Sequence, residues 1–351
     1  MPNRVIHLHD TVAGKAGAME SITKNRQSLD TLRRMVARAY GPDQVVEADD
    51  FAEELGHGWF NVAYRIRLRD GRRVVLKIAP PTGASVMTYE QDMMRNEVAA
   101  VELVRARTRV PVPAVEHFDD ACDLCDAPWF FMPFVEADNF GILAEDGKRT
   151  PEEADSLSEQ LGAVNAELNA VVGPHFGRLA GPGSQTWRGA FETMIEDVLM
   201  DGERGGLDLG RDYGSVREVI ADHLPLLDAV TEPRFVEWDL WSSNTMVRGG
   251  RIVAVIDHER AFWGDPLMEA GFVGIDLPAT GDPSAFVRGY GLAPLTGEER
   301  GRRRLYTLYL ILIMIIETHY RGHETPAQYD WARARLDELM GAFGRTEPAA
   351  P

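Results

Sequence analysis

One lysine of this sequence stands where a charged side chain is costly. Lys77 lies inside the apolar run Val74-Val-Leu-Lys-Ile78, and an ammonium group is expensive to bury unless it meets an anion. Two anions would serve: a carboxylate from the helix that follows, with Glu97 as the first candidate and Glu90 as the next, and a phosphate of a ligand. The alternative is that Lys77 lies on an edge strand and extends its side chain so that the ammonium group reaches solvent.

A glycine-rich stretch precedes this lysine. Gly56 and Gly58 form a GxG pattern between two strand-like runs. Glycine has no Cβ, so a hairpin of this kind can approach a phosphate closely. The pattern alone is more often a simple turn, but with Lys77 on the next strand-like run it predicts a phosphate-binding hairpin.

A second stretch, residues 235–244, carries Asp239 and Asn244 five positions apart in a loop that enters a hairpin. Asp257 ends the second strand of that hairpin, so the turn can bring it back beside Asn244. Oxygen ligands of this kind suit Mg²⁺, whose other ligands are phosphates and water. Asp239 is then left to orient and deprotonate a hydroxyl. Together with Lys77, this set has the parts of a site for phosphoryl transfer.

The first third of the chain must supply the strand with Lys77 and the helix with Glu97. Apolar periodicity predicts five strands and two helices there. The strands are expected at 52–56, 61–68, 73–79, 114–118 and 129–135, and the helices at 29–40 and 89–108. This pattern indicates a small sheet with one long helix between its third and fourth strands.

The rest of the chain has mostly helical periodicity. Helices are expected at 152–172, 187–199, 216–227, 302–319 and 327–343, with strands at 244–247 and 252–256 around the turn Gly249-Gly250. The apolar run 305–316 covers about 18 Å as a helix, less than the roughly 30 Å of a bilayer core. It therefore predicts a buried helix and not a membrane span.

Composition limits the partners of the protein. The 351 residues include 37 Lys and Arg against 55 Asp and Glu, a formal net charge of −18. Nucleic acids and anionic membranes reward basic side chains, so we expect neither as a partner. The N-terminus has no apolar segment of signal-peptide length, and we expect a cytoplasmic protein.

Two cysteines, Cys122 and Cys125, are the only ones in the chain, so no disulfide framework is expected. With His117 they offer three potential zinc ligands, but a structural zinc site needs four. We favour an ordinary turn in a reduced protein.

In this order and spacing, the motifs resemble the aminoglycoside phosphotransferase and choline kinase-like superfamily. They are the GxG hairpin, VVLK, the helix glutamate, DLWSSN, and VID followed by Gly264-Asp-Pro266; DLWSSN is also similar to fructosamine kinases. The resemblance covers about residues 20–340. It implies an α+β fold of protein kinase type with two lobes, one a small antiparallel sheet with one long helix and the other larger and mainly helical.

The resemblance also implies a division of the chain. A nucleotide-binding lobe is expected at 19–132, a connector at 133–136, and a catalytic and acceptor-binding lobe at 137–343. The remaining 1–18 and 344–351 are expected to be flexible extensions.

Roles follow from the resemblance for individual residues. Lys77 would hold the nucleotide α- and β-phosphates with Glu97 as its ion-pair partner, and Gly56 and Gly58 would border the phosphates. Asp239 would be the catalytic base, and Asn244 and Asp257 would bind Mg²⁺.

The segment 131–135 resembles the connector whose backbone groups meet the adenine. Pro133 has no N–H, so the expected contacts are Met132, Phe134 and Val135. The nucleotide is expected to be ATP, with GTP as an alternative.

Two positions depart from the family pattern. Glu237 and Trp238 stand directly before Asp239, where the family usually has a histidine and a small residue. That histidine mainly supports the loop, and Trp238 could narrow the acceptor site or stack on a substrate ring. Glu269 stands after GDP where aspartate is common.

The acceptor is expected to be a small molecule with a hydroxyl group, and a cationic one. Residues 136–212 contain sixteen acidic and six basic side chains, and such a surface attracts cations over long distances. The alternative is that these acids are solvated helix faces. Glu317, an acid in an apolar helix, is either paired internally or points into a site.

We therefore expect an ATP-dependent kinase that phosphorylates an alcohol group of an aminoglycoside-like antibiotic, which would confer resistance. Glu269, Glu317 and Trp238 are the candidate acceptor residues. The alternatives are a metabolic kinase for a fructosamine, choline or another small alcohol, and a nucleotide-binding pseudokinase. A third reading is an unrelated acidic binding protein. The sequence does not indicate an oligomeric state.

Overall fold

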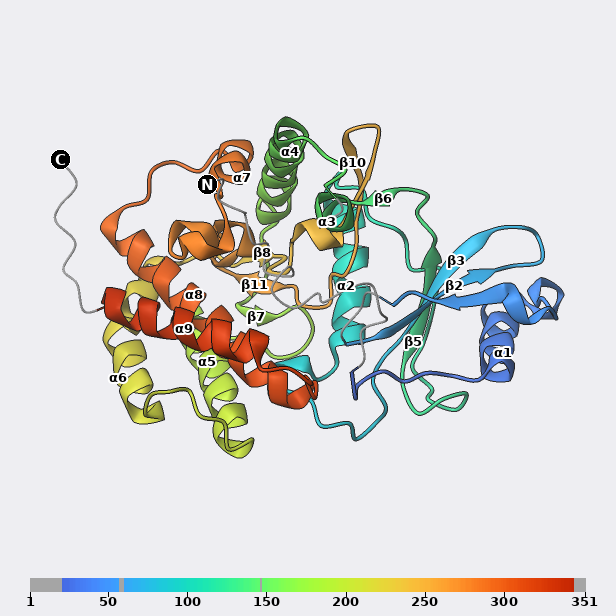
Figure 1. Ribbon diagram of the computed structural model, residues 1–351, viewed down its shortest axis with the longest axis horizontal. Coiled ribbons are helices and arrows are strands. Elements are labelled where there is room, and N and C mark those ends of the chain that lie inside the picture. The colour runs from blue at the N-terminus through green and yellow to red at the C-terminus, as the bar shows by residue number, and fades with distance from the viewer. Residues whose placement is uncertain (1–20, 57–59, 146, 344–351) are drawn as a thin grey trace.

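The computed structural model describes residues 21–56, 60–145 and 147–343. Gly58 and the expected extensions at 1–18 and 344–351 lie outside these ranges. The described chain folds into two lobes of unequal size (Figure 1), a small one built on a sheet and a larger one built mainly of helices. The fold is the bilobal, kinase-like α+β class that the sequence predicted.

The small lobe contains an antiparallel sheet with the strand order β1-β2-β3-β5-β4. Its strands are Ala52–Glu54 (β1), Val62–Arg67 (β2), Arg73–Ile78 (β3), His117–Asp119 (β4) and Trp129–Pro133 (β5). Gly71 turns the chain between β2 and β3 with a φ of 89°, which glycine adopts without strain. Helices α1 (Leu29–Tyr40) and α2 (Met93–Arg107) complete the lobe, and α2 is the expected helix between the third and fourth strands.

Helix α2 begins four residues later than predicted. Residues Thr88–Glu90 form a separate 3₁₀ turn, and this turn is bonded to the large lobe. The backbone N–H and the hydroxyl of Thr88 donate to the Asp201 carboxylate at 2.6 and 2.8 Å, and Glu90 pairs with Arg321 at 2.9 Å. These tertiary contacts override the helical periodicity, which carries no information about them.

The large lobe contains the remaining helices and two small sheets. The helices are Phe140–Glu145 (α3), Pro151–Asn169 (α4), Trp187–Arg204 (α5), Tyr213–His223 (α6), Ser284–Tyr290 (α7), Gly297–Tyr320 (α8) and Ala327–Phe343 (α9). The sheets have the orders β10-β9-β6 and β7-β11-β8. Their strands are Asp138–Asn139 (β6), Gly177–Arg178 (β7), Arg234–Val236 (β8), Thr245–Arg248 (β9), Arg251–Val255 (β10) and Phe262–Gly264 (β11).

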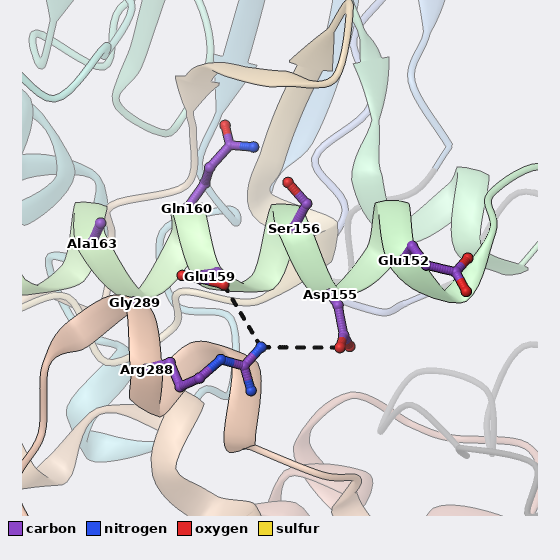
Figure 2. A pocket seen from close by; sticks show the side chains of 8 residues that line it. All are labelled: Glu152, Asp155, Ser156, Glu159, Gln160, Ala163, Arg288 and Gly289. Carbon is purple, nitrogen blue, oxygen red and sulfur yellow. Dashed lines mark ion pairs between the residues drawn. The ribbon is translucent and has the colours of Figure 1, made fainter.

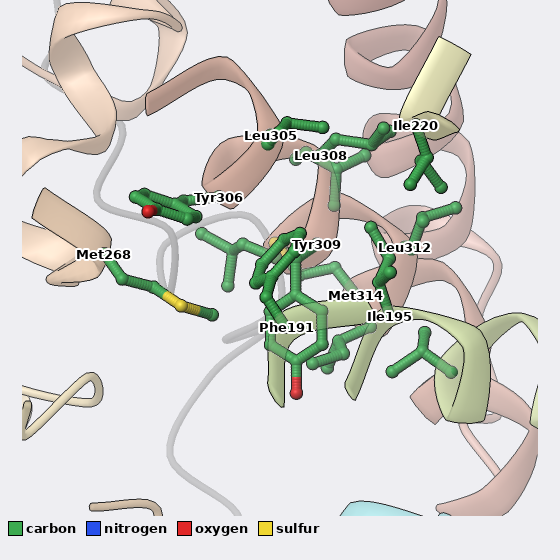
Figure 3. Close-up of a cluster of buried hydrophobic side chains, with 14 of the residues drawn as sticks. Phe191, Ile195, Ile220, Met268, Leu305, Tyr306, Leu308, Tyr309, Leu312 and Met314 are labelled. Atoms are coloured by element: carbon green, nitrogen blue, oxygen red, sulfur yellow. The ribbon is translucent and has the colours of Figure 1, made fainter. Parts of the chain in front are cut away.

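Helix α8 lies at the centre of the large-lobe core. Every residue of the apolar run 305–316 is buried in it, as the sequence predicted. Figure 3 shows Tyr306, Tyr309 and Leu312 of α8 beside Phe191 and Ile195 of α5. Among the described helices, none has the length and apolarity that crossing a membrane requires.

Two glycines let helices α4 and α7 pack unusually closely. A Cβ at Gly162 of α4 would lie 2.0 Å from the carbonyl oxygen of Phe286, and one at Gly289 of α7 would lie 1.8 Å from the carbonyl oxygen of Glu159. Both obstacles are backbone atoms, which cannot rotate away. The helix pair that fixes this side of the large lobe therefore depends on the missing side chains.

We expect Gly289→Ala to lower the free energy of unfolding by about 1–3 kcal/mol or more, because the added methyl overpacks a backbone contact. Gly297→Ala is the matched control, since a Cβ at this other helical glycine meets nothing within 4 Å, and its effect should stay within about 1 kcal/mol. Urea denaturation followed by circular dichroism measures both. Equal stability of Gly289→Ala and wild type would contradict the close helix crossing.

Candidate active site

Lys77 lies in the middle of the small-lobe sheet, on β3 between Ala63 of β2 and Phe130 of β5. Its side chain is 8% exposed. The Nζ atom lies 2.7 Å from both carboxylate oxygens of Glu97 on α2 and 2.5 Å from Oδ1 of Asp257. Because the strand is central and the ammonium is enclosed by acids, the alternative of a solvent-directed lysine at a strand edge does not hold.

A third carboxylate, Glu259, belongs to the same cluster. Its Oε2 lies 3.8 Å from Lys77 Nζ and accepts a hydrogen bond from Asn61 Nδ2 at 2.5 Å. Glu97, Asp257 and Glu259 each place an oxygen within 4.8 Å of the others. One ammonium therefore faces three carboxyl groups, and a bound cation would favour the ionised form of all three.

The cluster shifts the protonation of its members. Burial alone would lower the pKa of Lys77, but the carboxylates of Asp257 and Glu97 outweigh it and hold that pKa above the usual value. Burial would raise the pKa of Asp257, and the Lys77 ammonium reverses this shift to a lower value. For Glu97 and Glu259 burial dominates and the pKa rises, in Glu259 to about 8. Asp257 is thus the most acidic member of the cluster, whereas Glu259 is mostly protonated at neutral pH.

Asp239 lies in the loop between β8 and β9. Its Oδ1 accepts a hydrogen bond from Trp241 Nε1 at 2.7 Å, and its backbone carbonyl accepts one from Asn244 Nδ2 at 2.8 Å. Among the described residues, Oδ2 has no hydrogen-bond donor. The side chain is 21% exposed and Arg260 Nε lies 3.8 Å from Oδ2, so this oxygen is the one left for a substrate hydroxyl.

The hairpin of β9 and β10 brings Asp257 to Asn244, as the sequence predicted. The N–H of Ile256 donates to the Asn244 carbonyl at 3.0 Å, and Asp257 follows directly with a left-handed φ of 73°. Carboxylate and amide oxygens at this position fit the ligand preference of Mg²⁺. Cys122 and Cys125 belong to no comparable cluster of ligands in the described part of the chain.

Strain is concentrated directly before the loop acid. Trp238 has a φ of 61°, which is unfavourable for a bulky side chain. Glu269 stabilises this backbone conformation, because its two carboxylate oxygens accept hydrogen bonds from the backbone N–H groups of Glu237 and Trp238, both at 2.9 Å. Asn169 Nδ2 donates to the same carboxylate at 2.7 Å. Glu269 is completely buried, so the structure places this expected acceptor residue under the loop and away from any acceptor.

Glu237, which replaces the histidine usual at this position, faces a histidine from another element. His258 Nδ1 lies 2.8 Å from Glu237 Oε1, and both side chains are 1% exposed. The other ring nitrogen, Nε2, lies 3.2 Å from the Val255 carbonyl oxygen. The two side chains form an ion pair when the ring is doubly protonated. Burial alone would lower the pKa of His258, but Glu237 outweighs it and raises that pKa.

Glu317, the second expected acceptor residue, is paired internally. Its Oε2 lies 3.0 Å from Arg321 and 3.7 Å from Arg260, and Gln328 donates to its Oε1 at 2.7 Å. Burial would raise the pKa of Glu317, but the two guanidinium groups hold it below the usual value. Of the two alternatives that the sequence left open, the structure thus shows the internal partner.

Trp238, the third expected acceptor residue, is 4% exposed. Its ring contacts Tyr309 at 5.6 Å and Tyr89 at 6.4 Å between centroids. Arg260 lies over its face at 5.3 Å. The aromatic surface that the sequence offered to a substrate ring is therefore covered by other side chains of the protein.

The connector offers the N–H of Val135 as a backbone donor. The N–H of Phe134 donates a hydrogen bond to the Arg73 carbonyl oxygen at 3.0 Å. Met132 is part of strand β5, where it pairs with Val75 of β3. Among the described residues, the N–H of Val135 has no hydrogen-bond acceptor. Of the three residues expected at the adenine, Val135 is thus the one with an available N–H.

The acids of residues 136–212 are mostly exposed, on helices α4 and α5 and on the segments around them. Figure 2 shows Glu152, Asp155 and Glu159 on α4 around a surface hollow. Arg288 of α7 lies 4.0 Å from Asp155 and 3.6 Å from Glu159. At least part of this negative surface is therefore compensated by the protein itself.

Sequence reasoning missed three groups of this site. Glu259 and Arg260 follow Asp257 by two and three positions, and Trp241 follows Asp239 by two. An acid so close to a predicted metal ligand was a usable signal for Glu259. Nothing in the sequence indicated that Arg260 returns to Asp239, because that contact depends on the path of the chain after β10.

Fold and site together define a phosphotransferase of the kinase-like class. The sequence matches the phosphotransferase enzyme family over residues 52–306, and the chain belongs to this family. A search of curated proteins finds no match.

Solved structures of similar fold cover most of the chain. An aminoglycoside phosphotransferase APH(4)-Ia, studied as a thermostable mutant, has 18% identity and a TM-score of 0.62 over 90% of this chain and 100% of its own. A Thermobifida fusca protein assigned to the fructosamine-3-kinases has 20% identity and a TM-score of 0.60 over 88% of this chain and 100% of its own. An aminoglycoside 2′-phosphotransferase-IIIa mutant has 17% identity and a TM-score of 0.57 over 90% and 99%. At these identities the likeness shows the shared fold.

We expect Glu269→Gln to destabilise the protein by about 1–3 kcal/mol, because the amide NH₂ would face a backbone N–H and leave it without an acceptor. Nucleotide-dependent turnover should fall further than stability explains, since Trp238 loses its support beside Asp239. Glu192→Gln, on the exposed side of α5, is the control. Urea denaturation and turnover at saturating nucleotide measure the two effects, and a variant as stable as wild type would contradict the support role.

The buried pair of Glu237 and His258 predicts a pH dependence of stability. A raised histidine pKa in the folded state means that its contribution is complete below the unfolded value of about 6.5 and is lost as the pH rises through the folded value. The unfolding free energy of wild type should therefore decline above neutral pH. In the double variant Glu237→Gln/His258→Gln this part of the decline should vanish. If the unfolding free energies of wild type and the double variant depend on pH in the same way, the His258 ring is neutral in the folded protein and the prediction is wrong.

Proposed function

We propose that this protein is a small-molecule kinase that transfers the γ-phosphoryl group of a nucleoside triphosphate to a hydroxyl group. The observation that carries this proposal is the convergence of Lys77, Asp257, Asn244 and Asp239 at one place between the lobes. Lys77 contacts Asp257 directly, Asn244 bonds to the backbone of Asp239, and the hairpin joins the two pairs. Membership of the phosphotransferase family supports the same reaction.

The nucleotide would lie with its base at the connector and its phosphates at Lys77. Val135 offers the N–H for the base, and the ammonium of Lys77, held by Glu97, offers charge to the α- and β-phosphates. Related folds have been solved with ADP, AMP-PNP and GDP. ATP is the donor we propose, with GTP as the alternative.

Asn244 and Asp257 would hold Mg²⁺, and Glu259 lies close enough to Asp257 to contribute. Bound there, the ion would neutralise charge on the phosphates. Its presence would also offset the excess of carboxylates around Lys77.

Asp239 would orient the acceptor hydroxyl and accept its proton. Trp241 fixes one carboxylate oxygen, so the remaining oxygen, Oδ2, is the one that meets the hydroxyl. Positioning of this kind and proton transfer by a fixed side chain each contribute substantially to rate.

For the acceptor, we propose a cationic, aminoglycoside-like molecule as the first candidate. A structure of similar fold holds ADP together with hygromycin B, and the net charge of −18 favours the approach of cations. With such an acceptor the reaction would inactivate an antibiotic in the cytoplasm. A fructosamine is the second candidate, because of the similar fold of the Thermobifida fusca protein.

We expect purified protein with ATP and Mg²⁺ to phosphorylate a member of a panel of aminoglycosides and fructosamines, detected by mass spectrometry. Asp239→Asn should lower kcat about 10²–10⁴-fold, because the amide cannot accept the proton. Asp228→Asn, an exposed acid paired with Arg188, is the matched control and should leave kcat unchanged.

The same experiment separates the alternatives. Thermal stabilisation by ATP without product or hydrolysis would identify a pseudokinase. Equal turnover of Asp239→Asn and wild type would contradict the assignment of the base.

A further inference from the structure

Arg260 occupies an unusual place beside the loop acid. Its guanidinium lies 5.5 Å from the centroid of the Tyr89 ring and 5.3 Å from that of the Trp238 ring. Its Nε lies 3.8 Å from Asp239 Oδ2, and its Nη2 lies 3.7 Å from Glu317 Oε2. Two aromatic faces and two carboxylates from three different segments thus converge on one cation.

This surrounding is that of a binding site for an organic cation. Aromatic faces attract cations, most strongly when water is excluded, and the two carboxylates add Coulomb attraction. Such a site beside Asp239 could receive an ammonium group of an acceptor whose hydroxyl meets Oδ2. In this chain the guanidinium of Arg260, with its side chain 12% exposed, already fills it.

Among the residues that the structure describes, Arg260 is held by charge and stacking and not by direct hydrogen bonds. Both carboxylates lie beyond hydrogen-bond distance, and Nε has no partner among the described residues. A buried guanidinium donor without an acceptor is costly. An oxygen of a bound acceptor, next to the hydroxyl on Asp239 Oδ2, would satisfy such a donor.

We propose that Arg260 is a specificity-determining residue that fills the cation site of the acceptor pocket. The acceptor then carries a hydroxyl or carboxylate oxygen, and not an ammonium group, next to the hydroxyl that is phosphorylated. This inference rests on the proposed function for the identity of the reacting hydroxyl.

With Arg260 in this place, the site distinguishes acceptor classes that the sequence motifs do not distinguish. Choline carries its ammonium two carbons from the hydroxyl, so its charge would meet Arg260, and this alternative is disfavoured. A cationic antibiotic remains compatible when its ammonium groups lie away from the reacting hydroxyl. Sugar hydroxyls flanked by further hydroxyls, in an aminoglycoside or in a fructosamine, fit best.

The test compares binding of choline and its neutral isostere 3,3-dimethylbutan-1-ol to wild type and to Arg260→Ala. Indole N–H signals of Trp238 and Trp241, assigned by single Trp→Phe variants, report binding at this site by NMR in the presence of ADP. Choline should bind Arg260→Ala about tenfold or more tightly than wild type, because the emptied site keeps both rings and both carboxylates. The isostere should show no such preference.

Free guanidinium provides a second probe, since it should fill the space left in Arg260→Ala and shift the same signals. Arg288→Ala is the matched control. Arg288 also lies near two carboxylates without direct hydrogen bonds (Figure 2), but no aromatic ring lies over it among the described residues, so its removal should create no guanidinium site. If Arg260→Ala does not fold, Arg260→Ser opens the same space and allows water to bond to the serine.

Equal choline affinity in wild type and Arg260→Ala would overturn the proposal, and so would the absence of choline and guanidinium binding to the variant. ATP hydrolysis by wild type is measured in parallel with Mg²⁺. Its absence would count against the kinase function, whereas the titrations would still report whether Arg260 fills a cation site.

Discussion

The structure depends on one buried ammonium group that both lobes share. Lys77 comes from the central strand of the small-lobe sheet, Glu97 from α2, and Asp257 and Glu259 from the large lobe. A lysine in this position is stable only while the carboxylates surround it, and the carboxylates repel one another without it. Each lobe therefore needs the other at this point, and charge as well as packing holds the lobes together.

The loop that carries Asp239 is held in place by buried groups. Glu269 holds the strained backbone at Trp238, and the pair of Glu237 and His258 ties the loop to the end of the β10 hairpin. Because His258 is adjacent to Asp257, a shift of Glu237 would also move the proposed metal ligand Asp257. Family members are expected to have a histidine in the loop; here the acid is in the loop and the histidine is on the hairpin.

Sequence alone predicted most of this fold, because each element repeats a physical pattern. The strand with Lys77, the long helix with Glu97 and the hairpin before Asp257 are each recognisable from periodicity and turn residues. The start of α2 was wrong, since bonds from Thr88 and Glu90 to the large lobe decide it. Helices α3 and α7 and strands β6, β7, β8 and β11 were missed because they span only two to seven residues. Glu269 and Glu317 were recognised as unusual acids, but only tertiary structure shows that their partners are backbone N–H groups and arginines.

Long-range charge and local charge act differently on an acceptor. The protein as a whole is strongly acidic, which raises the concentration of cations near its surface and weakens with added salt. Close to Asp239, however, Arg260 and Arg321 balance Glu317 and Glu90. A polycation can thus be attracted by the exterior without an ammonium group at the reacting end. With the role proposed for Arg260, attraction and recognition are carried by separate residues. A change of surface charge would then alter the rate of capture, whereas a change at Arg260 would alter which hydroxyl is phosphorylated.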